Sequence, residues 1–442
     1  MMMEKNVKPY GQLSAAELSA LCGGLQTEFE GWKGKALKLD MSRGKPGKGQ
    51  LDLSMGMLDT VGSGGPVASE DGTDTRNYGV LDGIPEAKGL FAGMLGVPEA
   101  QVIVFGSSSL NVMYDTVARS FTHGVMGAEP WYLQAARTKD PIKFLCPAPG
   151  YDRHFAITEH FGIGMVNIPM TDEGPDMDMV ERLVNSDEGV KGIWCVPKYS
   201  NPLGTSYSDE TVRRFAALRP AAKDFRIYWD NAYCVHHLYP EADRQDSVLD
   251  IIEACAKAGN PDLVYEFAST SKLTFPGAGV AAMAASPANI ADVKNHMKYQ
   301  TIGNDKVNQL RQAKFLGDPE NLAAHMQKHA AIIRPKFEAV LDALETQLGG
   351  LGIARWTKPR GGYFISFEGL PGTAKAIVAR CKEAGVVMTG AGATYPYGKD
   401  PDDSNIRIAP TFPSLGEITQ AAQLFALCVK LVSAEKLLGE RG

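Results

Sequence analysis

Between residues 101 and 286 the chain repeats one pattern, in which a short apolar run leads into a polar turn and often into a helix-like stretch. This alternation is typical of α/β proteins with a parallel sheet. The apolar runs lack the strict alternation of half-exposed strands, which indicates strands buried on both faces. We predict strands at the seven runs 101–105, 143–146, 165–168, 192–196, 226–229, 264–267 and 280–283.

Further elements flank this block. Two Ser-x-x-Glu segments have the spacing of capping boxes and predict a short N-terminal helix after Ser14 and a longer C-terminal helix after Ser414. Apolar residues at helical spacing predict a helix over 333–348. Strand-like runs at 363–367 and 406–408 follow it, which indicates a separate α+β unit.

The chain is long enough for a larger and a smaller domain, because 442 residues is about three times the common domain size. We expect residues 1–29 to form an N-terminal arm and 60–315 to form the large domain. The small domain would join 30–59 to 316–442.

Charge and cysteine content exclude several classes of protein. The chain has 45 Lys and Arg against 51 Asp and Glu and no basic block, so we expect no nucleic-acid partner and no anionic membrane surface. The seven cysteines are scattered and form no C-x-x-C pair, which argues against a disulfide framework and against a metal site. No apolar run is long enough for a membrane span and no secretory signal is present, so we expect a cytoplasmic protein that binds small molecules.

Polar residues gather where the predicted strands end, which is where open α/β sheets bind ligands. Gly106 to Ser109 follow the first strand and precede a helix-like stretch, so Ser108 and Ser109 lie at a helix N-terminus suited to an anion. Plain N-capping by serine explains the same pattern.

Three more predicted strands end in polar segments. Asn201 follows the run at 192–196, Asp230 and Tyr233 follow 226–229, and Ser269 and Lys272 follow 264–267. Taken one at a time, these residues fit a turn, a helix cap and a solvated lysine. At the edge of a sheet, however, a desolvated lysine can lose its proton near neutral pH and form a Schiff base.

Together these groups are the ones that pyridoxal phosphate requires. Lys272 supplies an amine for the aldehyde, Asp230 a carboxylate for the ring nitrogen, and the serines and a helix end supply donors for the phosphate. Tyr151, which also follows a predicted strand, is a candidate to stack on the ring. The residues therefore predict a pyridoxal-phosphate site.

The sequence resembles the fold-type I pyridoxal-phosphate-dependent aminotransferases of class I/II, and within them the divergent aspartate aminotransferase subgroup Ic. The resemblance extends from about Leu39 to Pro413. The segments that carry it are 39–46, 50–54, 77–86, 106–110, 198–204, 230–233, 269–277, 361–364 and 405–408. It implies a large domain with a mostly parallel seven-stranded sheet, a smaller α+β domain, and a homodimer with shared active sites.

The resemblance also implies residue roles. Lys272 would be the Schiff-base residue and proton shuttle, and Asp230 would keep the pyridine nitrogen protonated. Asn201 and Tyr233 would bind the phenolate oxygen, and Tyr151 would stack on the ring. The phosphate ligands would be Ser108, Ser109, Ser269 and, from the neighbouring subunit, Tyr78.

For the substrate, the resemblance implies that Arg407 clamps the α-carboxylate with Asn201 beside it. Arg43 is the first candidate for a distal carboxylate, ahead of Lys45 and Arg360.

One position departs from the class I pattern. Many members carry a phosphate-binding arginine about eight residues after the lysine, but here Gly279 or Val280 stands at that place. The phosphate then needs hydroxyl groups and another cation, for which Lys198 and Arg43 are candidates.

The expected activity is transfer of an amino group from L-aspartate to 2-oxoglutarate by a ping-pong mechanism. A pyridoxal-phosphate lyase or decarboxylase on the same scaffold, or an aminotransferase with another donor, remains an alternative. A DNA-binding regulator with an aminotransferase-like domain is disfavoured, because only about 38 residues precede the pattern. The glycine motif at 277–282 leads into a strand rather than a helix, which argues against dinucleotide binding.

Overall fold

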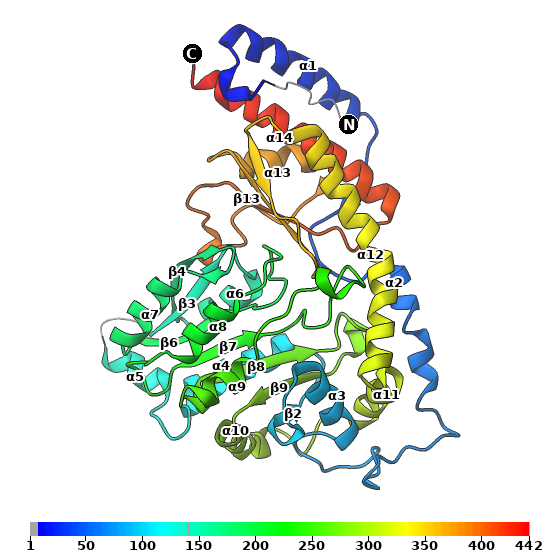
Figure 1. Ribbon diagram of the computed structural model, residues 1–442, viewed down its shortest axis with the longest axis vertical. Helices are drawn as coiled ribbons and strands as arrows, with labels where there is room; N and C mark the ends of the chain where they lie inside the picture. Colours follow the sequence, from blue (N-terminus) through cyan, green and yellow to red (C-terminus); the bar gives the residue numbers. More distant parts are fainter. Residues whose placement is uncertain (1–7, 139–141, 442) are drawn as a thin grey trace.

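The computed structural model describes residues 8–138 and 142–441, and its centre is one twisted sheet (Figure 1). Within those residues the sheet has eight strands, in the order β2-β9-β8-β7-β6-β3-β4-β5. Their bounds are β2 Val102–Val104, β3 Lys143–Ala148, β4 Gly164–Thr171, β5 Gly174–Pro175, β6 Val190–Cys195, β7 Arg226–Asp230, β8 Val264–Ser269 and β9 Ala281–Ala285.

All seven predicted strands are present. The eighth, β5, has two residues and pairs antiparallel with the end of β4, and it is too short for any apolar pattern to reveal it. The pairs β4-β3, β3-β6, β6-β7 and β7-β8 are parallel, whereas β9 runs antiparallel to both β2 and β8. The expected mostly parallel sheet is therefore confirmed, with one strand more than predicted.

Helices cover both faces of this sheet, as the continuous apolar runs indicate. Along β2 the side chains of Val102 and Val104 belong to one hydrophobic cluster and Ile103 to another. The same division separates Ile227 from Tyr228 on β7. The surrounding helices are α3 Pro85–Leu95, α4 Ser109–His123, α5 Trp131–Arg137, α6 Asp152–His160, α7 Met177–Ser186, α8 Asp209–Ala216, α9 Ile251–Lys257, α10 Pro287–Gln300 and α11 Lys306–Leu316.

The remaining segments form a second, smaller layer. A three-stranded antiparallel sheet has the order β10-β11-β13, and a short parallel pair joins β1 to β12. The strands are β1 Leu39–Asp40, β10 Ala354–Trp356, β11 Ile365–Gly369, β12 Val386–Val387 and β13 Asn405–Ile408. The helices are α1 Ala15–Lys33, α2 Lys48–Asp52, α12 Pro319–Leu348, α13 Ala374–Glu383 and α14 Leu415–Gly439.

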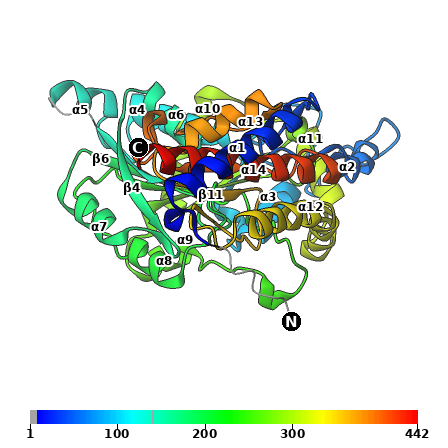
Figure 2. The same cartoon turned by 90° about the horizontal axis from the view of Figure 1, so that it is seen from above.

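Helices α1 and α14 lie side by side at the end of the molecule away from the large sheet (Figures 1 and 2). Both begin with the predicted capping box, at Ser14 and Ser414. Leu18 and Phe29 of α1 are buried in the same cluster as Phe425 of α14. Residues 15–33 thus pack on the C-terminal part of the same chain, and the domain boundaries given above stay a prediction.

Helix α12 is longer than expected. It begins at Pro319 rather than near 333, because Asp318 caps it by accepting a hydrogen bond from the backbone N–H of Asn321 at 2.8 Å. Pro335 lies inside the helix without ending it. Within residues 8–138 and 142–441 no helix is both long and apolar enough to cross a membrane.

Candidate active site

Asp230 ends β7 as a buried carboxylate with one satisfied oxygen. Its Oδ2 lies 3.0 Å from Nε2 of His154, on α6, and its Oδ1 has no hydrogen-bond partner within the described chain. The His154 ring stacks on Trp194 at 4.5 Å between centroids, which fixes the imidazole. An orphaned buried carboxylate oxygen is costly, so this geometry calls for a donor from a bound molecule.

Lys272 lies in the turn after β8, next to this carboxylate. Burial lowers the pKa of its amine, and the charge of Asp230 acts in the opposite direction. The amine nitrogen is 4.9 Å from the ring centroid of Tyr233 and 5.8 Å from that of Tyr363. The aromatic walls therefore hold an amine that deprotonates more easily than a surface lysine.

Serine side chains from two segments meet beside this turn. Ser108 is the N-cap of α4, where its hydroxyl accepts from the N–H of Asn111, and Ser109 is buried in the first turn. The Ser269 hydroxyl lies 3.2 Å from that of Ser271, which in turn donates to the carbonyl of Ser107 at 3.4 Å. Hydroxyl groups thus lie beside the N-terminus of α4, an arrangement that is suited to binding an anion.

Gly279 packs closely against the segments that carry these serines. A Cβ at Gly279 would lie 2.5 Å from the Ser107 carbonyl oxygen and 3.1 Å from the Ser271 hydroxyl. Val280 is buried, and its N–H donates to the Thr270 hydroxyl at 3.0 Å. A side chain as large as arginine therefore has no room at Gly279.

Arg407, on β13, is buried at the other side of the site. One of its terminal nitrogens donates to Asp152 at 2.7 Å and to the Asn201 side-chain oxygen at 3.2 Å, while Nε has no partner within the described chain. The guanidinium lies 5.0 Å from the ring centroid of Phe364. A buried guanidinium with a free N–H is suited to bind a carboxylate.

The remaining predicted cofactor residues within this chain border the same space. Tyr151 caps α6 and packs edge-on against His154 at 4.9 Å, and burial raises the pKa of its hydroxyl to about 12. Burial holds the pKa of Tyr233 well above its usual value, so its hydroxyl remains a donor. Asn201 is buried beside Arg407.

The other predicted residues lie apart from this group. Tyr78 is 83% exposed. Arg43 is exposed and makes no ion pair within residues 8–138 and 142–441, but Gly44 next to it packs against the Phe364 ring. Lys45 lies over the Phe412 ring at 3.9 Å.

Two candidate cations point elsewhere. Arg360 is directed at Asp246, 3.9 Å away. Lys198 donates to the Cys234 carbonyl at 2.7 Å. Within the described chain neither Lys198 nor Arg43 contacts the serines beside α4.

Sequence reasoning missed several residues of the site. His154 stands three residues after Tyr151 at the start of a helix, so its position on the same face was a usable signal. Asp152, Phe364 and Ser271 are neighbours in sequence of predicted residues, but no pattern separates them from ordinary caps and core positions. No local sequence pattern relates Gln50 to the turn that carries Lys272.

Pyridoxal phosphate fits these residues. The orphaned Asp230 oxygen matches a protonated ring nitrogen, the depressed pKa of Lys272 matches a carbonyl-binding amine, and the serine hydroxyls beside the N-terminus of α4 match a phosphate. Three independent features thus agree on one molecule.

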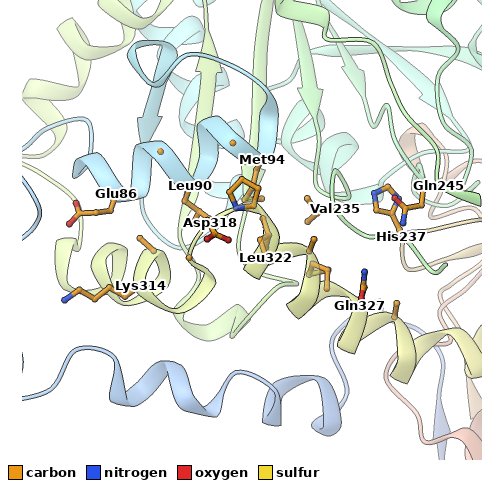
Figure 3. A pocket seen from close by; sticks show the side chains of 18 of the residues that line it. Glu86, Leu90, Met94, Val235, His237, Gln245, Lys314, Asp318, Leu322 and Gln327 are labelled. Carbon is orange, nitrogen blue, oxygen red and sulfur yellow. The ribbon is translucent and has the colours of Figure 1, made fainter. Parts of the chain in front are cut away.

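A separate pocket of about 740 Å³ lies between α3 and α12, next to the loop that carries His237 and Gln245 (Figure 3). Leu90, Met94 and Leu322 line its apolar part. None of the predicted site residues borders it, so this pocket is separate from the site assembled above.

Comparison with known proteins leads to the same conclusion. The family model of aspartate amino-transferase matches residues 13–441. An aspartate aminotransferase of Corynebacterium glutamicum is 45% identical over 412 residues, which is 93% of each chain. A protein of Mycolicibacterium smegmatis whose name places it among the aminotransferases is 49% identical over 418 residues, 94% of this chain and 96% of its own.

The crystal structure of an aspartate transaminase from Corynebacterium glutamicum superposes with a TM-score of 0.93 at 43% identity, covering 97% of this chain and 99% of that one. This match confirms the predicted fold class, and its extent covers both layers of the molecule. The resemblance seen in the sequence motifs is confirmed by the family model over nearly the whole length. The chain belongs to the aspartate aminotransferase family.

Proposed function

We propose that this aminotransferase moves the amino group of L-aspartate to 2-oxoglutarate in two half-reactions, with pyridoxal phosphate as cofactor and Lys272 as its attachment residue. The observation that carries the proposal is the pairing of Lys272 with a buried Asp230 whose Oδ1 has no partner in the described chain. The named activity of the similar Corynebacterium glutamicum protein supports aspartate as donor.

The bound cofactor supplies an aldehyde carbon for amines and a ring that withdraws electrons from the substrate Cα. Asp230 would hold a proton on the ring nitrogen, and His154 keeps the carboxylate in place. Ser108, Ser109 and Ser269 would bind the phosphate, together with the N-terminus of α4.

Lys272 carries out the proton transfer. Because burial lowers its pKa, the amine is available as a base at the substrate Cα and as a nucleophile that releases product. The Tyr233 hydroxyl stays protonated, because burial raises its pKa, and it would donate to the phenolate oxygen together with the side-chain amide of Asn201.

Arg407 orients the substrate. Its guanidinium is held by Asp152 and Asn201 and keeps a free N–H for the α-carboxylate. An amino acid whose α-carboxylate is held by Arg407 presents one of its Cα bonds to Lys272. This orientation favours transamination over loss of CO₂. Arg43, exposed beside the Gly44–Phe364 contact, is proposed for the distal carboxylate.

We also propose a homodimer in a reducing, cytoplasmic compartment. Tyr78, Tyr299 and Ile302 are strongly exposed, and Gly303 packs on the carbonyl of Gly79, so these apolar side chains share one surface. A second subunit would cover this surface and receive Tyr78 at its phosphate. All seven cysteines are free, which supports a reducing compartment.

The visible spectrum of the protein with pyridoxal phosphate, before and after L-aspartate, tests the proposal. Collapse of a Lys272-dependent band with release of oxaloacetate supports donor and half-reaction. A band indifferent to aspartate refutes the donor, and ammonia or CO₂ as product supports a lyase or decarboxylase instead. Lys272→Ala should abolish turnover, and a variant that turns over fully would refute the role of the lysine.

A further inference from the structure

The turn that carries Lys272 leaves two buried carbonyl groups without backbone partners. The N–H groups of Leu273 and Thr274 both donate to the Thr270 carbonyl, at 2.9 and 3.0 Å. Within the described chain no backbone N–H donates to the carbonyl of Lys272 or of Leu273. A buried carbonyl needs a donor, so side chains must supply it.

Side chains supply these donors. The Tyr363 hydroxyl donates to the Lys272 carbonyl at 3.4 Å, and Nε2 of His325 lies 2.7 Å from the Leu273 carbonyl. The Ser54 hydroxyl donates to the Leu273 carbonyl at 3.5 Å, and the His329 imidazole lies beside the same carbonyl, with its Nε2 3.1 Å from that of His325. Both imidazoles lie on α12, one turn apart.

Gln50 determines which way these bonds run. Its Oε1 accepts from the N–H of Gly47 at 3.1 Å, so its amide nitrogen faces Nδ1 of His329 at 3.2 Å and the Tyr363 hydroxyl at 2.9 Å. The Tyr363 oxygen therefore accepts a hydrogen bond from Gln50, and its own O–H donates to the Lys272 carbonyl.

The same donor fixes the tautomer of His329. Nδ1 accepts from Gln50, so the proton lies on Nε2 and points at the Leu273 carbonyl. His325 donates to that carbonyl from its own Nε2 at 2.7 Å, and the two Nε2 atoms lie 3.1 Å apart. Burial lowers the pKa of His329 to about 4, so the ring stays neutral and the direction holds at pH 7.

The chain of bonds joins parts of the molecule that are distant in sequence. Gln50 comes from α2, both histidines from α12, and Tyr363 from the loop before β11, and all four are buried. On α12 the other face is turned to the pocket, where Leu322 and Gln327 point between the helices (Figure 3). The face of α12 that carries His325 and His329 thus packs against the turn that carries Lys272.

We propose that Gln50, Tyr363, His325 and His329 form a one-directional hydrogen-bond chain that fixes the Lys272 and Leu273 peptide groups and thereby aims the Lys272 amine. They are positioning residues, because Tyr363 and the histidines act on the backbone, Gln50 acts through those side chains, and none of the four donates to the amine. The inference rests on the proposed function only in taking Lys272 as the reactive amine.

Tyr363→Phe is the main test, because it removes the hydroxyl and keeps the ring beside the amine. We expect kcat to fall about fivefold, the size of one buried hydrogen bond, with KM for aspartate changed less than about twofold. The midpoint of the pH titration of the visible band should move. Tyr265→Phe is the matched control, since that buried hydroxyl interacts with Arg226 and not with the turn.

A measurement on the cofactor-free protein distinguishes an effect on the orientation of the Lys272 amine from an effect on overall stability. The rate of reductive methylation of Lys272, followed by mass spectrometry against exposed lysines, should change at least about twofold in Tyr363→Phe and not in Tyr265→Phe. The two variants should lose similar amounts of thermal stability.

Gln50→Glu keeps the size and the acceptor for Gly47 but replaces the two donors with acceptors. The Tyr363 hydroxyl and His329 then donate to the new carboxylate, and both turn carbonyls lose donors. This variant should therefore resemble Tyr363→Phe, and the double variant should be clearly less impaired than the sum of the two.

The proposal is overturned if Tyr363→Phe has the same kcat, the same titration midpoint and the same methylation rate as Tyr265→Phe. Additive effects in the double variant would also overturn it. If Tyr363→Phe does not fold, Gln50→Glu decides by the same readouts. A Lys272→Ala enzyme that still turns over would instead refute the proposed function and leave the hydrogen-bond chain as a structural feature.

Discussion

Gly279→Ala tests whether the segment after the lysine forms the phosphate cradle. The added Cβ would lie 2.5 Å from the Ser107 carbonyl oxygen, and ordinary contact begins at 3.4 Å, so that oxygen must move by about 0.9 Å. The Ser271 hydroxyl, at 3.1 Å, must move as well. Overpacking of this kind costs about 1–3 kcal/mol.

If the strain is relieved by opening the cradle, the cost appears as weaker cofactor binding. Converted at 1.4 kcal/mol per tenfold, it corresponds to a dissociation constant for pyridoxal phosphate raised by about 5- to 140-fold. The assay is titration of the cofactor-free protein with pyridoxal phosphate, followed by the visible band, at equal ionic strength.

Gly277→Ala is the matched control, because it lies in the same loop and a Cβ there meets nothing within 4 Å. It should bind the cofactor like the unchanged protein. If Gly279→Ala binds with the affinity of this control while its thermal stability falls, the strain is real but the segment does not cradle the phosphate, and the reasoning is wrong.

Two further predictions concern buried carboxylates. Asp230→Asn keeps the shape of the side chain but removes its charge, so kcat should fall about 100-fold or more, and an unchanged kcat would contradict the role of the carboxylate. The pKa of Lys272 should also fall further, because the charge of Asp230 raises it. The methylation rate of Lys272 in the cofactor-free protein measures this change. Burial raises the pKa of Glu266 from 4.5 to about 8, so the folded state holds a proton that the unfolded state lacks, and stability contributed by this group is lost as the pH rises from about 4.5 to about 8. Glu266→Gln should flatten that loss in thermal unfolding of the cofactor-free protein, and an unaltered slope would refute the burial argument.

The sequence allowed the sheet to be predicted well because its signal is local. Runs such as 192–196 and 226–229 are continuous and apolar, as strands buried on both faces must be. The missing strand, β5, has only two residues, and the start of α12 depends on a cap at Asp318 rather than on apolar periodicity. Two-residue strands and helix caps produce a weaker sequence signal than buried apolar strands do.

The site was predictable where its residues stand at strand ends. Asp230, Ser269 and Lys272 follow β7 and β8 directly, so the sheet brings them together by its order alone. Arg407 was reached only by resemblance, since β13 belongs to the smaller sheet and no local pattern relates it to Asn201, 206 residues away. The Gly279 position was visible as a departure, but its cause, the approach of Ser107, is purely three-dimensional.

The lysine turn is held from two sides that act on different properties. On one side Ser271, Ser107 and Gly279 pack together beside the proposed phosphate site, whereas on the other Tyr363 and the α12 histidines hold the peptide groups. Strain on the first side changes how tightly the cofactor is bound, because the donors to its phosphate move. Loss of a bond on the second side leaves those donors in place and changes only the direction of the amine, so its effect falls on kcat. The two groups of variants should therefore separate cleanly, Gly279→Ala in cofactor affinity and Tyr363→Phe in turnover of the saturated enzyme. Equal effects of both variants on both quantities would mean that the turn responds as one rigid unit.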